Sequence, residues 1–222
     1  MSKVDSHKLE KPALIMIVGM PGSGKTYLMR RLAEDLGAVH ISAEKIRHEI
    51  FEKPSLTRDE EAVVRQLMMM LAEEFLKTGL SVLYDTSVST KDERKEMRDF
   101  ARKLKAEPIL IWQQLDTSTA FIRTQKRNPQ DNDDDRFAVP LSKDLFMGLS
   151  RQIQTPGEEE AIVISGKHSY KGQLQTVVRK LIEMRLIPQN DQLAKSVPKP
   201  GLVNLVSQTA RLDDTKRNIH IE

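Results

Sequence analysis

The segment that decides the fold reads ALIMIVGMPGSGKTYLMRRLAEDLG and spans residues 13–37. Its first seven residues are a continuous apolar run ending in glycine, which predicts a strand buried on both faces. From Lys25 to Leu36 the apolar residues recur at helical spacing, and Gly37 is a typical helix end. The segment therefore predicts a buried strand, a glycine-rich turn and an amphipathic helix in direct succession.

The turn itself, residues 19–26, reads GMPGSGKT and matches G-x-x-x-x-G-K-[ST] in full. Glycines let the main chain curl so that several N–H groups point at one anion, and the following helix adds its positive end. A lysine at this position can reach the β- and γ-phosphates, and the next hydroxyl can ligate Mg²⁺. We predict that a nucleoside triphosphate is bound by Gly19, Gly22, Ser23, Gly24, Lys25 and Thr26.

Beyond this segment, short apolar runs alternate with amphipathic ones. This alternation predicts an α/β fold with a five-stranded parallel sheet and helices on both faces. Besides the strand at 13–19 and the helix at 25–36, we predict strands at 38–42, 81–85, 108–115 and 161–165, and helices at 43–52, 56–78, 90–105, 117–127, 142–154 and 170–186. Around this domain, 13–187, we expect a flexible arm at 1–12 and an extended C-terminal tail at 188–222.

Composition excludes several kinds of site. The chain of 222 residues carries a formal net charge of +3, which is too small by itself to indicate nucleic-acid binding. Cysteine is absent, which excludes disulfides, thiolate nucleophiles and zinc sites built on cysteine. No apolar stretch has the length of a membrane span, and no cleavable signal pattern precedes the first strand. We therefore expect a cytoplasmic protein that does not enter a membrane.

The nucleotide-binding classes differ in their further motifs. The sequence contains neither the N-K-x-D motif of GTPases nor an LSGGQ-like signature of transport ATPases, and it is short for a helicase or motor. A kinase needs only a small core, an acceptor pocket and a mobile cover. The motifs that are missing therefore favour a kinase.

Four motifs follow one another along the chain: GMPGSGKT, AEKIR at 43–47, LYDTS at 83–87 and FIRTQKRN at 121–128. On these residues the chain resembles, over about 13–185, the small P-loop kinases related to polynucleotide kinase. This group also includes zeta-toxin-like and antibiotic phosphotransferases. The resemblance implies the P-loop kinase fold, ATP and Mg²⁺ as cofactors, and transfer of the γ-phosphoryl group to a hydroxyl.

In the resembling family the second motif reads D-x-x-R, in which the acid takes the acceptor's proton and the arginine contacts the substrate. The matching residues here are Glu44 and Arg47, so the carboxylate is displaced by one methylene. A general base must lie within hydrogen-bond reach of the proton that it takes. The alternative is a surface pair on one helix, worth about 0.2–0.5 kcal/mol.

Asp85 closes the third predicted strand, at the edge of an open sheet where ligands gather. A carboxylate there can hold Mg²⁺ together with Thr26, or it can position the acceptor; the alternative is a cap for the next helix. In the resembling family the D-x-[TS] segment lines the active site. The resemblance therefore adds Thr86 to the substrate-binding residues.

Arg123 and Arg127 are four residues apart, so they project from one face of a helix. In the resembling kinases, arginines here belong to a lid, which corresponds to about 123–140 in this chain. Such arginines cover the γ-phosphate and neutralise charge that develops on the transferred group. The alternative is a solvated basic face. We expect His40, in the second strand, to be a structural histidine.

No motif identifies the acceptor. A small molecule and a polynucleotide 5′-hydroxyl are both open, although only ten aromatic residues are available to stack bases. One alternative function is an NTPase or nucleotide-dependent switch that has no acceptor. Another is a binding protein that lost transfer chemistry, which the glutamate at 44 keeps open, with a protein partner engaged through 188–222.

Overall fold

The computed structural model describes residues 9–55, 57–127, 137 and 141–188. The described residues form one parallel sheet in the order β2-β3-β1-β4-β5, which confirms the predicted five-stranded parallel sheet. Its strands are β1 (Ala13–Val18), β2 (Val39–Ser42), β3 (Val82–Ser87), β4 (Glu107–Gln114) and β5 (Ile162–Ser165).

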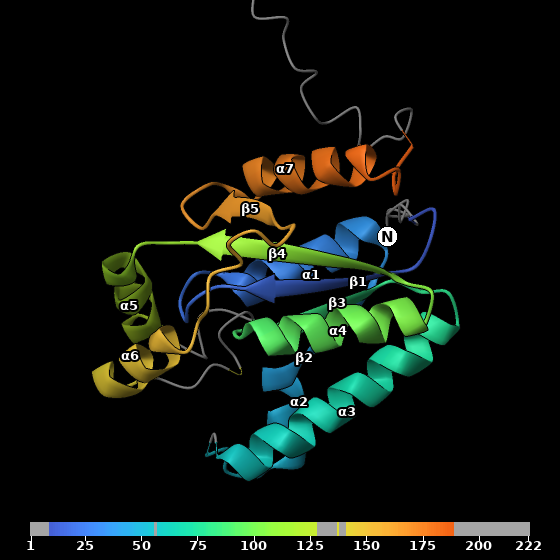
Figure 1. Cartoon of the computed structure of the whole chain (residues 1–222). Helices are drawn as coiled ribbons and strands as arrows, with labels where there is room; N and C mark the ends of the chain where they lie inside the picture. Colours follow the sequence, from blue (N-terminus) through green and yellow to red (C-terminus); the bar gives the residue numbers. More distant parts are fainter. Residues whose placement is uncertain (1–8, 56, 128–136, 138–140, 189–222) are drawn as a thin grey trace, which may run out of the picture.

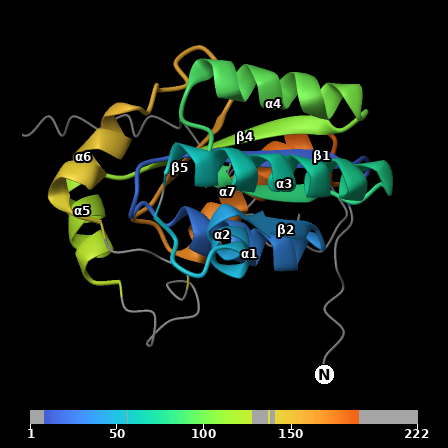
Figure 2. The ribbon, with the colours of Figure 1, turned by 90° about the horizontal axis from the view of Figure 1, so that it is seen from below.

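Helices cover both faces of this sheet, as predicted. Figures 1 and 2 show α1 and α7 on one face, α3 and α4 on the other, and α5 and α6 beyond the carboxyl ends of the strands. The helices are α1 (Lys25–Leu36), α2 (Ala43–Ile50), α3 (Arg58–Lys77), α4 (Lys91–Lys103), α5 (Thr117–Gln125), α6 (Lys143–Arg151) and α7 (Tyr170–Glu183).

The central strand β1 explains why its sequence is apolar without interruption. Successive side chains of a strand point to opposite faces. Ile15 and Ile17 pack into the core beneath α1 and α7, whereas Leu14 and Met16 pack into the core beneath α3 and α4. All six residues of β1 are buried, so this strand holds both halves of the domain together and fixes where the turn after it emerges.

The first described residues belong to the folded domain. Leu9 is 5% exposed, and the Glu10 N–H donates to the Leu186 carbonyl at 3.0 Å. The structure therefore anchors residues 9–12, which the sequence analysis assigns to a flexible arm. Residues 1–8, most of the predicted lid and the tail from 189 on lie outside the described residues.

The tail's partner and the cytoplasmic location stay predictions. None of the helices that the structure describes has the length and apolar character needed to cross a membrane.

Candidate active site

The glycine-rich loop, residues 19–26, follows β1 directly and leads into α1. Gly22 and Gly24 have φ angles of 79° and 95°, in the left-handed region that favours glycine. A Cβ added at Gly22 would lie 2.2 Å from the Ala120 carbonyl oxygen, and one added at Gly19 would lie 2.6 Å from the Gln113 carbonyl oxygen. The main chain therefore curls as the motif predicts, and it is pressed against β4 and α5.

No side chain of the glycine-rich loop caps the amino end of α1. Its N-cap is Gly24, so the first N–H groups of the helix have no side-chain acceptor. The Ser23 N–H donates to the Met20 carbonyl at 3.1 Å and braces the turn from within. Uncapped N–H groups and the positive end of a helix form a ready site for an anion.

Lys25 lies across the glycine-rich loop. Its Nζ donates to the carbonyls of Gly19 and Met20, at 2.9 and 3.1 Å. Burial lowers the pKa of Lys25 to about 8, against the raising effects of Glu44 and Asp85. The two carboxylates therefore do not offset the cost of burying the charged ammonium group of Lys25. A bound polyphosphate would raise the pKa of Lys25 and keep this group protonated.

This lowered pKa of Lys25 predicts a pH dependence. Between about 8 and the ordinary 10.5, the unfolded chain binds more protons than the folded one, so folding stability rises with pH there. An anion that restores the charge must take up a proton in the same window. We expect ATP affinity to fall by up to about tenfold per pH unit above pH 8, since one proton is linked to binding.

Titration of ATP between pH 7 and pH 10 would measure this dependence. The matched variant is Lys25→Met, which keeps the length of the side chain and lacks the proton. An equal slope in both proteins would contradict the assignment to Lys25.

Asp85 lies at an irregularity of β3. Met16 pairs with Tyr84 but Ile17 pairs with Ser87, so the strand bulges at Asp85 and Thr86. Bulges re-aim side chains. Asp85 is 4% exposed, and its Oδ1 accepts a hydrogen bond from Thr26 Oγ1 at 3.4 Å. The structure thus brings together the two residues predicted to hold a metal.

His40 contacts the same carboxylate. Its Nε2 lies 2.9 Å from Asp85 Oδ2, because β2 runs beside β3 with Ser42 opposite Asp85. The expected structural histidine is therefore a neighbour of the candidate metal site. Two oxygen donors, Thr26 Oγ1 and Asp85 Oδ1, match the hard ligands that Mg²⁺ prefers when phosphates and waters complete its shell.

Glu44 lies in the first turn of α2, and the Ser42 Oγ that caps this helix accepts from the Lys45 N–H. Burial raises the pKa of the Glu44 carboxyl, while Arg127 is the strongest influence in the opposite direction. The charges of Asp85, Lys25 and Arg47 also act on it. The structure therefore gathers five predicted charged residues into one electrostatic cluster.

Arg47 is a buried residue of α2, and only 8% of its surface is exposed. Its Nε has no hydrogen-bond partner within the described ranges. A buried polar group without a partner is costly, so an unpaired guanidinium N–H beside Glu44 is available to a ligand.

The two arginines near the end of α5 differ in what they contact. Arg127 acts on the pKa values of both Lys25 and Glu44. Arg123 is exposed, and its Nη1 donates to the Gly166 carbonyl at 3.0 Å, on the loop after β5. The structure thus brings Arg127 into the charged cluster and ties Arg123 to a different loop.

The residues after Asp85 line the same edge. Thr86 is half-buried within the bulge, and Ser87 Oγ donates to the Gly19 carbonyl at 3.3 Å. Thr86 is the residue that the D-x-[TS] segment predicts at the site. The tie between β3 and the glycine-rich loop through Ser87 depends on strand adjacency, so the sequence pattern does not predict it.

One known family covers the part of the chain that carries most of these residues. A family model described as an AAA domain matches residues 14–143, a range that includes the glycine-rich loop, Glu44, Asp85 and Arg127. No curated protein sequence matches the chain significantly.

Solved structures share the fold at low sequence identity. A gluconokinase from Sinorhizobium meliloti 1021 aligns with a TM-score of 0.58 at 17% identity, over 78% of this chain and 94% of its own. Chaetomium thermophilum Kti12 in complex with ADP-AlF3 aligns with a TM-score of 0.59 at 18% identity, over 77% and 97%. A chain of the Pnkp1/Rnl/Hen1 RNA repair complex aligns with a TM-score of 0.57 at 20% identity, over 72% and 49%.

Proposed function

We propose that this chain, which belongs to the AAA-domain family, is an ATP- and Mg²⁺-dependent kinase acting on a hydroxyl. Its likeness in fold to a gluconokinase supports the proposal. The observation that carries the proposal is the electrostatic cluster around the glycine-rich loop. Lys25, Glu44, Asp85 and Arg127 come from four different segments, yet their charges act on one another. A loop that only binds nucleotide does not require a half-buried carboxylate with a raised pKa, such as Glu44.

Binding of ATP uses the glycine-rich loop. The uncapped amino end of α1 faces the phosphates, and Lys25 Nζ exchanges the Gly19 and Met20 carbonyls for phosphate oxygens. Thr26 and Asp85 would hold Mg²⁺, which would neutralise part of the charge on the phosphates. The resulting complex fixes the γ-phosphorus near the carboxyl end of β3.

Transfer requires a base. The Glu44 carboxylate takes the proton of the acceptor hydroxyl while that oxygen bonds to the γ-phosphorus. The bond from the γ-phosphorus to the bridging oxygen breaks, and ADP leaves. The raised pKa of Glu44 makes its carboxylate a stronger base than an ordinary glutamate, which suits a general base. Arg127 supplies positive charge beside the reacting groups, and Arg47 offers its free Nε–H to the acceptor.

A screen with γ-labelled ATP tests this function. The acceptors are sugars, nucleosides, aminoglycoside-like compounds and oligonucleotides with a 5′-hydroxyl. We expect label in one of these classes, with one ADP formed for each phosphoryl group transferred. Steady release of ADP and phosphate without a labelled acceptor would favour the NTPase or switch. ATP binding without any turnover would favour a binding protein.

Arg127→Ala should separate transfer from binding. We expect turnover to fall by about 10²–10³, because a charge that stabilises the transferred group is removed. ATP affinity should change by only a few-fold, because the glycine-rich loop is intact. The matched control is Lys126→Ala, which removes an exposed cation from the neighbouring position. Equal losses of binding and turnover in Arg127→Ala would contradict its role in transfer.

A further inference from the structure

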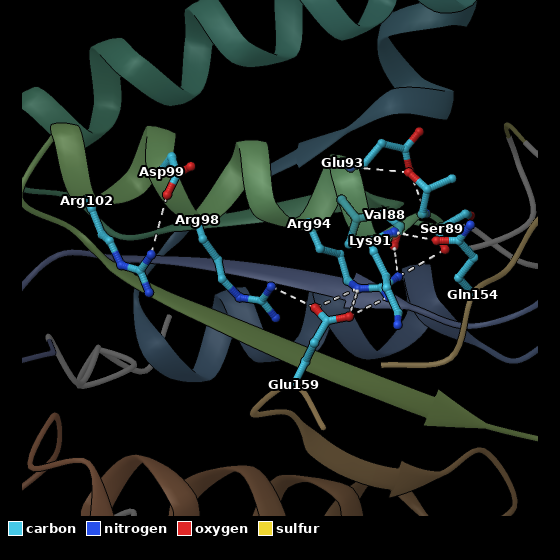
Figure 3. A network of polar contacts seen from close by, with 11 residues as sticks. Val88, Ser89, Lys91, Glu93, Arg94, Arg98, Asp99, Arg102, Gln154 and Glu159 are labelled. Carbon is cyan, nitrogen blue, oxygen red and sulfur yellow. Dashed lines mark hydrogen bonds and ion pairs between the residues drawn. The ribbon is translucent and has the colours of Figure 1, made fainter. Parts of the chain in front are cut away.

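A buried arginine on α4 contacts the loop that follows β3. Arg94 on α4 is 0% exposed, and Figure 3 shows its guanidinium between three segments of the chain. Its Nε lies 3.1 and 3.0 Å from the two carboxylate oxygens of Glu159, and its Nη2 lies 2.7 Å from Oε1. Its Nη1 donates to the carbonyls of Val88 and Ser89, at 3.1 and 3.0 Å.

These contacts join the β3–α4 loop, residues 88–90, to the α6–β5 connection, residues 152–161. Gln154 adds a second tie, since its N–H donates to the Ser89 carbonyl and its Oε1 accepts from the Lys91 N–H, both at 2.9 Å. Arg94 and Arg98 together hold the pKa of Glu159 below its ordinary value. The carboxylate therefore remains charged at neutral pH and keeps the guanidinium oriented.

The other side of the β3–α4 loop faces the glycine-rich loop. The Val88 N–H donates to the Ile17 carbonyl at 3.1 Å, at the end of β1. Ser89 Oγ lies 3.1 Å from Ser87 Oγ, which in turn donates to the Gly19 carbonyl at 3.3 Å. Asp85 lies two residues before Ser87, at the bulge of β3. A displacement of Val88 and Ser89 would therefore move both the bulge and its contact with Gly19.

We propose that Arg94 is a positioning residue that, held by Glu159, fixes the carbonyls of Val88 and Ser89 and thereby places Asp85 against the glycine-rich loop. It acts through the main chain and touches none of the reacting groups. The inference rests on the proposed function only in assigning ATP and Mg²⁺ to the site that Arg94 supports.

The chemistry of arginine separates this role from simple packing. Apolar side chains pack a buried helix face at a lower desolvation cost than a charged pair does. Only a planar guanidinium with five donors can bond two carbonyls and both oxygens of a carboxylate at once. Lysine keeps the charge but cannot make all of these bonds.

Arg98 provides a matched control on the same helix. Its Nη1 lies 2.7 Å from Glu159 Oε2, so it shares the carboxylate with Arg94. None of the hydrogen bonds between described residues joins Arg98 to the β3–α4 loop. Arg94→Lys and Arg98→Lys therefore both disturb Glu159, but only the first releases the loop.

The experiment compares ATP binding with Mg²⁺ and with EDTA in the full chain. For Arg94→Lys we expect the ATP affinity measured in EDTA to lie within about twofold of wild type. The factor by which Mg²⁺ increases ATP affinity should fall about tenfold, as it does when a residue that orients a metal ligand is replaced. Amide exchange over residues 86–90 should rise in the same variant. Arg98→Lys should match wild type in both measurements.

Two results would overturn the proposal. One is a folded Arg94→Lys protein with wild-type Mg²⁺ dependence and exchange. The other is an equal loss of ATP affinity with and without metal, because that result indicates general loosening. If Arg94→Lys does not fold, Glu159→Gln is measured in its place. A smaller loss of ATP affinity that appears only with Mg²⁺ supports the proposal. Equal ATP affinities relative to wild type with and without Mg²⁺ overturn it.

Failure of the proposed function can be recognised separately. If the site binds MgATP but transfers no phosphoryl group, the binding comparison above still applies. If the site does not take MgATP, wild type shows no Mg²⁺-dependent ATP binding. Amide exchange of residues 86–90 can still be compared between Arg94→Lys and Arg98→Lys. Faster exchange in Arg94→Lys supports the positioning role, and equal exchange in the two variants overturns it.

Discussion

Replacing Lys25 by alanine is expected to weaken ATP binding about a hundredfold and to abolish the thermal stabilisation that ATP provides, since hydrogen bonds to charged groups contribute about 1.5–3 kcal/mol each. Lys25 Nζ already lies over the glycine-rich loop, 2.9 Å from the Gly19 carbonyl. Burial lowers the pKa of Lys25 to about 8, so nearby carboxylates do not fully compensate its charge. The free variant should therefore be at least as stable as wild type at neutral pH.

Thermal denaturation with and without MgATP measures both effects. Arg30→Ala is the matched control, because Arg30 lies on the same helix and forms a partly exposed pair with Glu34. This control should keep the full ATP-dependent rise in Tm. A Lys25→Ala protein that ATP stabilises as strongly as wild type would refute the assignment of the triphosphate to residues 19–26.

Glu44→Gln is expected to lower transfer by about 10²–10⁴, the usual contribution of a positioned general base. ATP should bind at least as tightly as in wild type, because a negative charge near the triphosphate is removed. Glu44→Asp should retain part of the activity, since it keeps the carboxylate and shortens its reach by one methylene. Single-turnover transfer and direct ATP titration measure the two steps separately.

Glu49→Gln is the control for Glu44, because Glu49 is an exposed acid near the end of the same helix. It should leave both steps unchanged. Wild-type transfer in Glu44→Gln would show that another group takes the proton. Equal release of ADP and phosphate in both proteins, without a labelled acceptor, would favour the NTPase.

The elements that the sequence predicts well are set by local pattern. The apolar run of β1, the glycines of the loop and the helical stripe of α1 lie within 25 consecutive residues, so their order requires no knowledge of distant contacts. Strand adjacency is different, because the order β2-β3-β1-β4-β5 depends on packing between remote segments. The contact of His40 with Asp85 follows from that order and could not be predicted without it.

The same distinction applies to the candidate site. Glu44, Asp85 and Arg127 each stand at the end of a predicted element, and the carboxyl edge of the sheet brings them together. Arg123 shares a helix face with Arg127 in the pattern, but its partner Gly166 lies 43 residues away. Arg94 stands in a highly charged helix and is buried because Glu159, 65 residues away, reaches it.

Amide hydrogen exchange, with and without MgATP, tests most directly whether the glycine-rich loop grips the triphosphate. The account predicts strong protection of residues 19–27, where the loop and the first N–H groups of α1 become hydrogen-bond donors to phosphate. Saturating MgATP that protects other segments, while 19–27 exchange as in the free protein, would contradict it.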